Sequence, residues 1–551
     1  MSTLPPAPDD AGAAAPIDVA SATAAPVRGA RRSTVLVMLA TLLTKLVGVV
    51  RETATSTVFG TAGVMSAFTV AFQIPNVIRT FVADQALVSA VVPVFTKLRV
   101  DDEEARAWRV ASTVVSVLLL LLVPLTLIAM AFGEFFIDIV VYDNFNQFPL
   151  AIELFRIMIP VVVLMSIGGV IIGILNSYGK FGPGAFAQLA FNVVAVGMLI
   201  AVTMMLDTQH DKIVAYAWTI LIATFVQAVL PMPWLRGRGH RLVLGGAFRD
   251  PMVKAVVVAM LPVMLSLAMM NLNNIVNTYW SSRIDADQLR GVVDAGPAVI
   301  YKAFTVFQLP QGIFSLAVAT VFFPLFSRHS ATKDDDAFRS AVGAGIRQIS
   351  VLLMPAAVFM FVLAEPIVEL LFEYGKTTHP QSLLIASALR GFSVGLIANG
   401  AIQLLMRAYF SLGTPWTPAI IGFFANLLVN VVLGGLLHNQ LGVFGVTLSM
   451  AFANTCSFLV MWIVLRRRLA GLPMLPVVSA LAVSAAASAL CVAIGWAGWQ
   501  GVHTALGSGL LARLLAMVVA ITLTWGLYAP LALKLRLVNA PQLRRALKRG
   551  R

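Results

Sequence analysis

The sequence predicts an all-α polytopic membrane protein with about fourteen transmembrane helices. With 59% hydrophobic residues, 12% charged residues and a mean hydropathy of +0.89, the chain of 551 residues is too apolar for a soluble protein. Apolar runs long enough to cross about 30 Å of hydrocarbon follow one another along the chain. Lys and Arg residues gather in alternate loops between these runs, which is typical of cytoplasmic loops.

The distribution of the positive charge and of the two cysteines argues against a nucleic-acid-binding protein and against a protein built on disulfides or a cysteine metal site. The positive charge lies in short clusters between apolar runs, so nucleic-acid binding is not expected. Cys456 and Cys491 both lie inside apolar segments. Neither a disulfide framework nor a cysteine metal site is therefore expected.

The elements follow in a regular order. Residues 1–32 are rich in Ala, Pro and Asp without periodicity, which predicts a disordered cytoplasmic tail. The predicted transmembrane segments are 34–59, 63–95, 108–133, 153–178, 184–206, 213–235, 252–281, 296–326, 342–364, 383–411, 415–437, 441–465, 474–496 and 509–533. Residues 536–551 form a basic tail.

The charges of the loops predict the topology. Basic clusters lie in the loops after even-numbered segments, at 97–109, 236–254, 328–339 and 466–468. The opposite loops are mostly acidic or neutral. Because positive loops stay in the cytoplasm, both termini are predicted to be cytoplasmic.

An internal repeat predicts two lobes. Residues 72–75 (FQIP) recur as residues 307–310 (FQLP), 235 positions later, and segment 178–194 resembles 409–432 at a similar offset. The alternative is chance similarity between proline-containing apolar helices. A true repeat predicts an N-lobe at 33–240, a C-lobe at 241–468 and two further helices at 469–535, with a site between the lobes.

Four charged residues, Lys45, Arg51, Arg79 and Asp84, lie within the first two apolar segments. A charge near the bilayer centre costs roughly 2.5 to 3.5 kcal/mol, so such charges are expected to face a cavity. Arginines grip phosphate oxygens with two parallel hydrogen bonds, which favours an anionic substrate. The alternative is a structural role, with Lys45 reaching the interface and the arginines paired with Glu52 and Asp84. Lys302 adds a cation from the second half.

Signals of catalysis are missing from the sequence. It contains no nucleophile elbow, no phosphate-cradling glycine loop and no metal-binding histidine cluster. We therefore expect a transporter, with no catalytic residue, metal or cofactor.

Several motifs resemble one known family, the MurJ/MviN lipid II flippases of the MOP exporter superfamily. They are residues 46–52 (LVGVVRE), 59–60, 67–68, 75–79, 92–93, 174–176, 183–187, 277–278, 310–312, 371–376 and 393–396. Their order and spacing extend the resemblance over residues 34–535.

The resemblance implies a cationic cavity between two lobes of six helices, with the last two helices forming a groove for a polyprenyl tail. It implies that Arg51 and Arg79 line the cavity and are essential, with Lys45 as an additional cation. Two positions depart from the family: a usual aspartate falls on Ser66, and a usual arginine of the eighth helix falls on Thr305. Lys302 lies nearly one helical turn before Thr305 and places a charge in the same region.

The implied function is to flip an undecaprenyl-diphosphate-linked peptidoglycan precursor, lipid II, across the bacterial cytoplasmic membrane by alternating access. Membrane potential is the expected driving force, and coupling to an ion is an open alternative. Peptidoglycan synthesis enzymes are candidate partners. Two alternatives remain: an exporter of another lipid-linked oligosaccharide or a drug, and a non-transporting scaffold of cell-wall synthesis.

Overall fold

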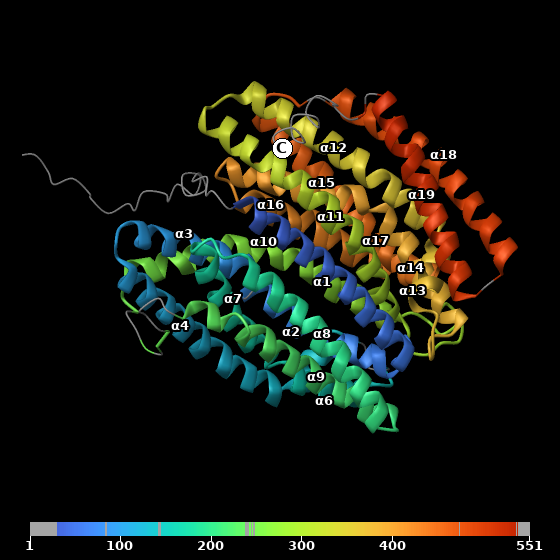
Figure 1. Ribbon diagram of the computed structural model, residues 1–551, viewed down its shortest axis with the longest axis horizontal. Helices are drawn as coiled ribbons and strands as arrows, with labels where there is room; N and C mark the ends of the chain where they lie inside the picture. Colours follow the sequence, from blue (N-terminus) through green and yellow to red (C-terminus); the bar gives the residue numbers. More distant parts are fainter. Residues whose placement is uncertain are drawn as a thin grey trace, which may run out of the picture.

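The computed structural model describes residues 30–82, 85–141, 145–236, 242–243, 245, 248–472, 474–507, 509–535 and 537. These residues form long helices joined by short turns, and none of them lies in a strand (Figure 1). The predicted all-α class is confirmed. Most of the predicted tails, including residues 1–29 and 538–551, lies outside the described residues.

Eight helical stretches of the described chain are long and apolar enough to cross a membrane. A ninth is added if the pair at His379–Val394 and Leu396–Ser411, bent by 47°, crosses as one span. The chain is therefore a multi-pass membrane protein. The count of fourteen spans is not confirmed and stays a prediction.

The first group of helices packs around one hydrophobic core, in which the ring of Tyr216 lies 5.1 Å from that of Phe68 and 5.8 Å from that of Phe59. Its members are α1 (Ala30–Phe59), α2 (Val64–Val82), α3 (Gln85–Val100), α4 (Glu104–Ala131), α5 (Gly133–Asp138), α6 (Phe148–Met158), α7 (Val161–Ser177), α8 (Gly182–Met205), α9 (Gln209–Val229) and the 3-10 turn η2 (Met232–Leu235).

The predicted fourth segment, 153–178, lies almost entirely within one apolar stretch long enough to cross a membrane, Phe148–Ser177, but this stretch comprises two helices. Pro160 lies between α6 and α7. A proline has no N–H to donate to the preceding turn, and its ring clashes with the carbonyl four residues earlier. The interruption therefore follows from one residue inside an otherwise continuous apolar run.

The second group packs around another core, at which the ring centroids of Phe304, Phe307 and Phe392 lie 5.5 to 5.8 Å apart. Its members are α10 (Pro251–Ser281), α11 (Gly296–Ala331), α12 (Asp335–Val362), α13 (Ala364–Phe372), α14 (His379–Val394), α15 (Leu396–Ser411), α16 (Trp416–Ile421), the π-helical η3 (Gly422–Leu428) and α17 (Val429–Arg468). Gly442, at φ 57° and ψ −138°, interrupts α17 where two predicted segments meet.

Helix α10 belongs to both groups. Val253, Val256 and Met260 in its first half are buried in the first core. Trp280 near its end packs against the second core. In Figure 1 α10 and α1 lie between the two groups, so these two helices form much of the interface between them.

The last two helices, α18 (Met474–Leu506) and α19 (Leu510–Lys534), form a pair along one edge of the molecule (Figure 1). The Tyr528 hydroxyl donates to the Val351 carbonyl of α12 over 2.8 Å, and the Trp525 ring lies edge-on to Phe359 at 5.1 Å. This pair is thus attached to the second group. Its predicted role as a lipid-tail groove and the predicted lobe boundaries stay predictions.

Candidate functional site

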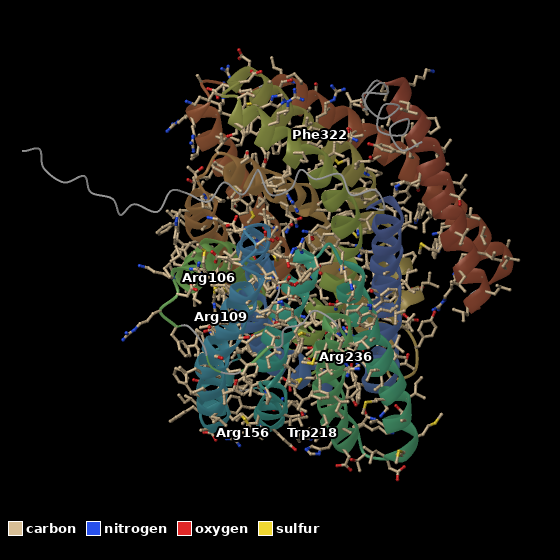
Figure 2. All side chains as sticks on the ribbon, turned by 60° about the vertical axis from the view of Figure 1, so that its left-hand side comes forward. Arg106, Arg109, Arg156, Trp218, Arg236 and Phe322 are labelled. Carbon is tan, nitrogen blue, oxygen red and sulfur yellow. The ribbon has the colours of Figure 1, made fainter. Side chains whose placement is uncertain are left out.

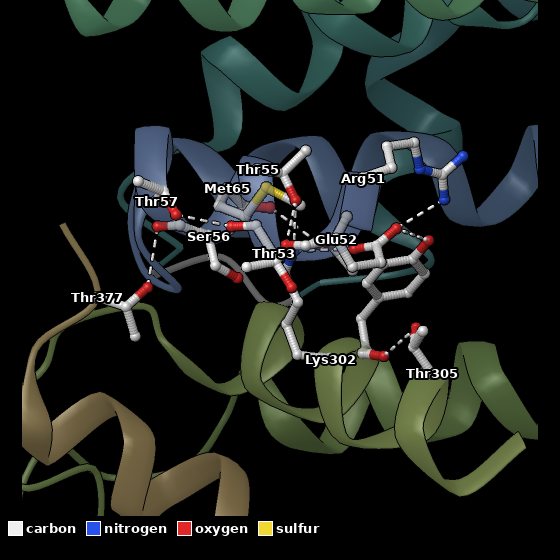
Figure 3. Close-up of polar contacts among 12 residues, drawn as sticks. Arg51, Glu52, Thr53, Thr55, Ser56, Thr57, Met65, Lys302, Thr305 and Thr377 are labelled. Carbon is white, nitrogen blue, oxygen red and sulfur yellow. Dashed lines mark hydrogen bonds and ion pairs between the residues drawn. The ribbon is translucent and has the colours of Figure 1, made fainter. Parts of the chain in front are cut away.

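A buried ion pair between Glu52 and Lys302 joins α1 to α11 (Figure 3). The Lys302 Nζ donates to Glu52 Oε2 at 2.8 Å, to the Glu52 carbonyl at 2.9 Å and to Thr55 Oγ1 at 2.5 Å. Lys302 is 0% exposed and Glu52 3% exposed. A buried ammonium is tolerated only with full compensation, and here all three of its donors have partners.

The same carboxylate also holds Arg51, the neighbouring residue in α1. Arg51 Nη2 donates to Glu52 Oε1 at 2.6 Å, and the Tyr301 hydroxyl of α11 donates to the same oxygen at 3.4 Å. One carboxylate therefore faces two cations, one from each group of helices. The local sum of charge is one positive charge, which favours the binding of an anion.

The environment of Arg51 leaves part of its guanidinium available. Its side chain is 17% exposed, and its plane lies 5.4 Å from the ring centroid of Phe191 in α8. Within the described chain its Nε has no hydrogen-bond partner. A guanidinium that is positioned but not saturated can still bind phosphate oxygens with a second edge.

Arg79 lies near the same place on α2. Its Nη2 donates to Asn76 Oδ1 over 2.9 Å, which fixes the side chain along its own helix. Helix α11 contacts both α1 and α2, and the Tyr301 hydroxyl of α11 reaches Glu52. The structure thus brings α1, α2 and α11 together, and the cavity between the lobes stays a prediction.

The remaining predicted site residues have different positions. Lys45 is exposed on α1, and Asp84 lies outside the described residues. Ser66 is fully buried and its Oγ accepts from the Ala298 N–H over 3.4 Å, whereas the partly buried Thr305 donates to the Tyr301 carbonyl of its own helix over 3.1 Å. Lys302, expected as a free cation, is occupied by Glu52 in this conformation.

Close backbone contacts hold the two groups together at the last turn of α1. The Lys376 N–H donates to the Thr57 carbonyl at 3.0 Å, and Thr377 Oγ1 donates to the Ser56 carbonyl at 2.9 Å. Gly375, at φ +59°, is so close that a Cβ there would lie 2.3 Å from the Thr57 oxygen. Only glycine fits this contact without a shift of backbone.

The turn after α1 extends this contact to the start of α14. The Thr61 hydroxyl and N–H both donate to Gln381 Oε1, at 3.1 and 3.3 Å. The contact between α1 and the loop between α13 and α14 is named the closure from here on. It involves main-chain atoms on both sides, so it closes one end of the surface between the two groups.

Sequence reasoning missed the central residue of the site. Glu52 was considered only as a structural partner, although it holds both Arg51 and Lys302. Its location beside Arg51 in an apolar segment was a signal, because a lone carboxylate there needs a partner. Tyr301 and Thr55, which complete the site, carry no comparable signal in the sequence.

Comparison with solved structures identifies the fold. A lipid II flippase MurJ in an inward closed conformation superposes with a TM-score of 0.72 at 18% identity, covering 91% of this chain and 99% of that chain. An inward-facing MATE multidrug resistance transporter of the MOP superfamily gives 0.64 at 18% identity, covering 79% and 98%. The chain therefore has the fold of the MOP-superfamily transporters.

Sequence comparison identifies the family. The family model of the lipid II flippase MurJ matches residues 55–520, and the chain belongs to this family of transporters. The lipid II flippase MurJ of Burkholderia cenocepacia is 27% identical over 437 residues, 78% of this chain and 82% of that protein. A probable lipid II flippase MurJ of Rhizobium meliloti is 27% identical over 522 residues, 93% and 95% of the two chains. The prediction of a MurJ-type transporter rather than an enzyme is confirmed.

Proposed function

We propose that this protein moves lipid II across the membrane and that the site around Glu52 binds the diphosphate of the lipid. The observation that carries the proposal is the bridge of one carboxylate to two cations on opposite groups of helices. A diphosphate offers the same kind of oxygen ligand as the Glu52 carboxylate. It can therefore compete for Arg51 and join Arg79 on the neighbouring helix.

Alternating access follows from where the contacts lie. The closure holds the end of α1 against the loop between α13 and α14, while Glu52 holds α1 against α11. A diphosphate that offers oxygens to Lys302 as well as to Arg51 competes with Glu52 for the second contact and favours separation of the groups. For the substrate to drive this change, the diphosphate must bind more tightly to the state with separated groups than to the closed state.

Membrane potential supplies the driving force in this proposal. With both termini in the cytoplasm, outward transfer of an anionic headgroup gains about 2.3 kcal/mol per charge for each 100 mV. No cofactor is needed for such a step. The excess positive charge at Arg51 and Lys302 disfavours cationic drugs, which is the physical difference from an exporter of such compounds.

The test uses the full-length protein in liposomes that contain fluorescent lipid II. We expect Arg51→Ala and Arg79→Ala each to slow flipping by about tenfold or more, since a charge-assisted hydrogen bond contributes about 1.5 to 3 kcal/mol. Arg339→Ala is the matched control, because Arg339 pairs with Asp336 at 3.2 Å near the start of α12, away from the site.

Two outcomes would contradict the proposal. Unchanged flipping by both site variants would remove the diphosphate site. Absence of flipping by the wild-type chain, together with normal outward exposure of lipid II in cells depleted of it, would favour the scaffold alternative.

A further inference from the structure

An open apolar groove lies on the outside of the first group, and none of its lining residues belongs to the Glu52 site. It has a volume of about 520 Å³ and is lined by α4, by α9 and by the residues around Pro160. Trp218 of α9 lines it and is 51% exposed. The lining carries almost exclusively hydrocarbon side chains, so its occupant inside a membrane is an alkyl chain.

One end of this groove carries a cation. Arg156 of α6 is exposed, lies one turn before Pro160, and its Nε donates to the Met130 carbonyl at 3.0 Å. Met130 itself lines the groove. Figure 2 shows Arg156 and Trp218 near the same end of the bundle.

The Arg156 side chain is fixed but only partly used. Its Nη1 and Nη2 atoms have no partner in the described part of the chain. Gly133 admits the side chain between α4 and α6, because a Cβ at this position would lie 3.4 Å from Arg156 Nε. An arginine held through Nε presents its two remaining nitrogens as a fork that matches phosphate oxygens.

An acidic residue lies one turn beyond the cation. Glu153 is three residues before Arg156 on α6, so the two side chains share one face. Glu153 Oε2 lies 3.3 Å from His210 Nε2 at the start of α9, and both residues line a second, polar pocket of about 260 Å³. The surface along α6, α7 and α9 that carries Glu153, Arg156 and the apolar groove is named the seam. Along it the carboxylate comes first, then the guanidinium, then the groove.

We propose that this seam binds one phospholipid with an amine-bearing headgroup, its phosphate on Arg156, its ammonium on Glu153 and one acyl chain in the groove beside Trp218. The order of charges matches a phosphate followed by an ammonium, and the carboxylate disfavours headgroups that carry only negative charge. The seam is separate from the Glu52 site, so this proposal does not depend on the proposed substrate.

The test measures quenching of Trp218 fluorescence by phospholipids with brominated chains. The full-length protein is placed in bilayers of phosphatidylcholine with increasing brominated phosphatidylethanolamine, and Trp218→Phe isolates the signal of this residue from the other tryptophans. We expect the relative association of brominated phosphatidylethanolamine to exceed that of brominated phosphatidylcholine. It should fall about fivefold or more in Arg156→Ala and recover largely in Arg156→Lys.

The variant Glu153→Gln tests the choice of headgroup. It should remove the preference for phosphatidylethanolamine over phosphatidylglycerol while leaving chain binding intact. Quenching that follows the bulk mole fraction equally for every headgroup and variant would overturn the proposal, because it would mean ordinary surrounding lipid. Displacement of the brominated lipid by a polyprenyl diphosphate instead would assign the groove to the transported lipid and would also overturn it. The lipid-binding test is independent of the flipping test, because Arg51 is not part of the seam.

Discussion

Lys302 of α11 and Glu52 of α1 form a 2.8 Å ion pair in which neither side chain is more than 4% exposed. Desolvation makes such a pair costly to create, and removal of one partner costs more because a bare charge is left inside. The presence of the pair is therefore weak evidence for a net gain in stability. It leads directly to a test by paired substitutions.

Lys302→Met should lower the free energy of unfolding by about 3 kcal/mol, since Glu52 then keeps only Arg51 as a charged partner. The double variant Glu52→Gln with Lys302→Met should recover at least about 1 kcal/mol of this loss, because the two residues are coupled. Unfolding of the purified protein in detergent measures both. Strictly additive effects of the two substitutions would contradict a direct ion pair.

Gly375→Ala should open the closure, because its Cβ would lie 2.3 Å from the Thr57 oxygen. Gly413→Ala is the matched control, since Gly413 also has a positive φ, +68°, but has nothing within 4 Å of the added Cβ. The measurement is the rate at which a cysteine at Gln381 reacts with a maleimide after Cys456 and Cys491 are replaced by Ser. Equal rates in the two alanine variants would show that the close contact does not hold the closed state.

A covalent link across the closure should stop transport. Thr61 Oγ1 and Gln381 Oε1 lie 3.1 Å apart, so cysteines at these two positions are within reach of a short cleavable cross-linker. We expect flipping in liposomes to cease after cross-linking and to return after cleavage, because the groups must separate there. Each single-cysteine variant, treated alike, controls for modification. Continued flipping by the cross-linked protein would exclude movement at this contact.

The ion pair between Arg106 and Asp250 predicts that the stability of the protein depends on pH. Arg106 donates to both carboxylate oxygens of Asp250, at 2.9 and 3.1 Å, and these bonds hold the pKa of Asp250 below its ordinary value. A lowered folded-state pKa stabilises the protein above the unfolded pKa of about 3.9 and loses this effect as the pH falls through the folded value.

Asp250→Asn should therefore reduce stability at pH 7 by about 0.5 to 1 kcal/mol, and the difference from wild type should shrink below about pH 4. Asparagine can still accept from the Met252 N–H as Asp250 does at 2.9 Å, so the helix cap is kept. Unfolding followed from pH 7 to pH 3 measures the effect. A difference that does not change with pH would assign it to packing.

The sequence was informative about properties that depend on residues near one another in the chain. Apolar runs predicted the all-α membrane class and helix beginnings such as Gly296 and Met474, because hydropathy depends on near neighbours. Arg51 and Lys302 were conspicuous as charges within apolar segments. Their common partner was not predicted, because Glu52 and Lys302 are 250 positions apart and only packing brings them together. The interruption at Pro160 was missed although the proline was visible.

All three partners of the Lys302 ammonium are atoms of α1: the Glu52 carboxylate, the Glu52 carbonyl and the Thr55 hydroxyl. A movement of α1 away from α11 removes them in one step and leaves an ammonium that must be solvated again. On the proposed function, the empty protein bears that cost in full, whereas the oxygens of a bound diphosphate replace those that the ammonium loses. In the proposed transport cycle, this arrangement disfavours opening of the protein without a bound substrate.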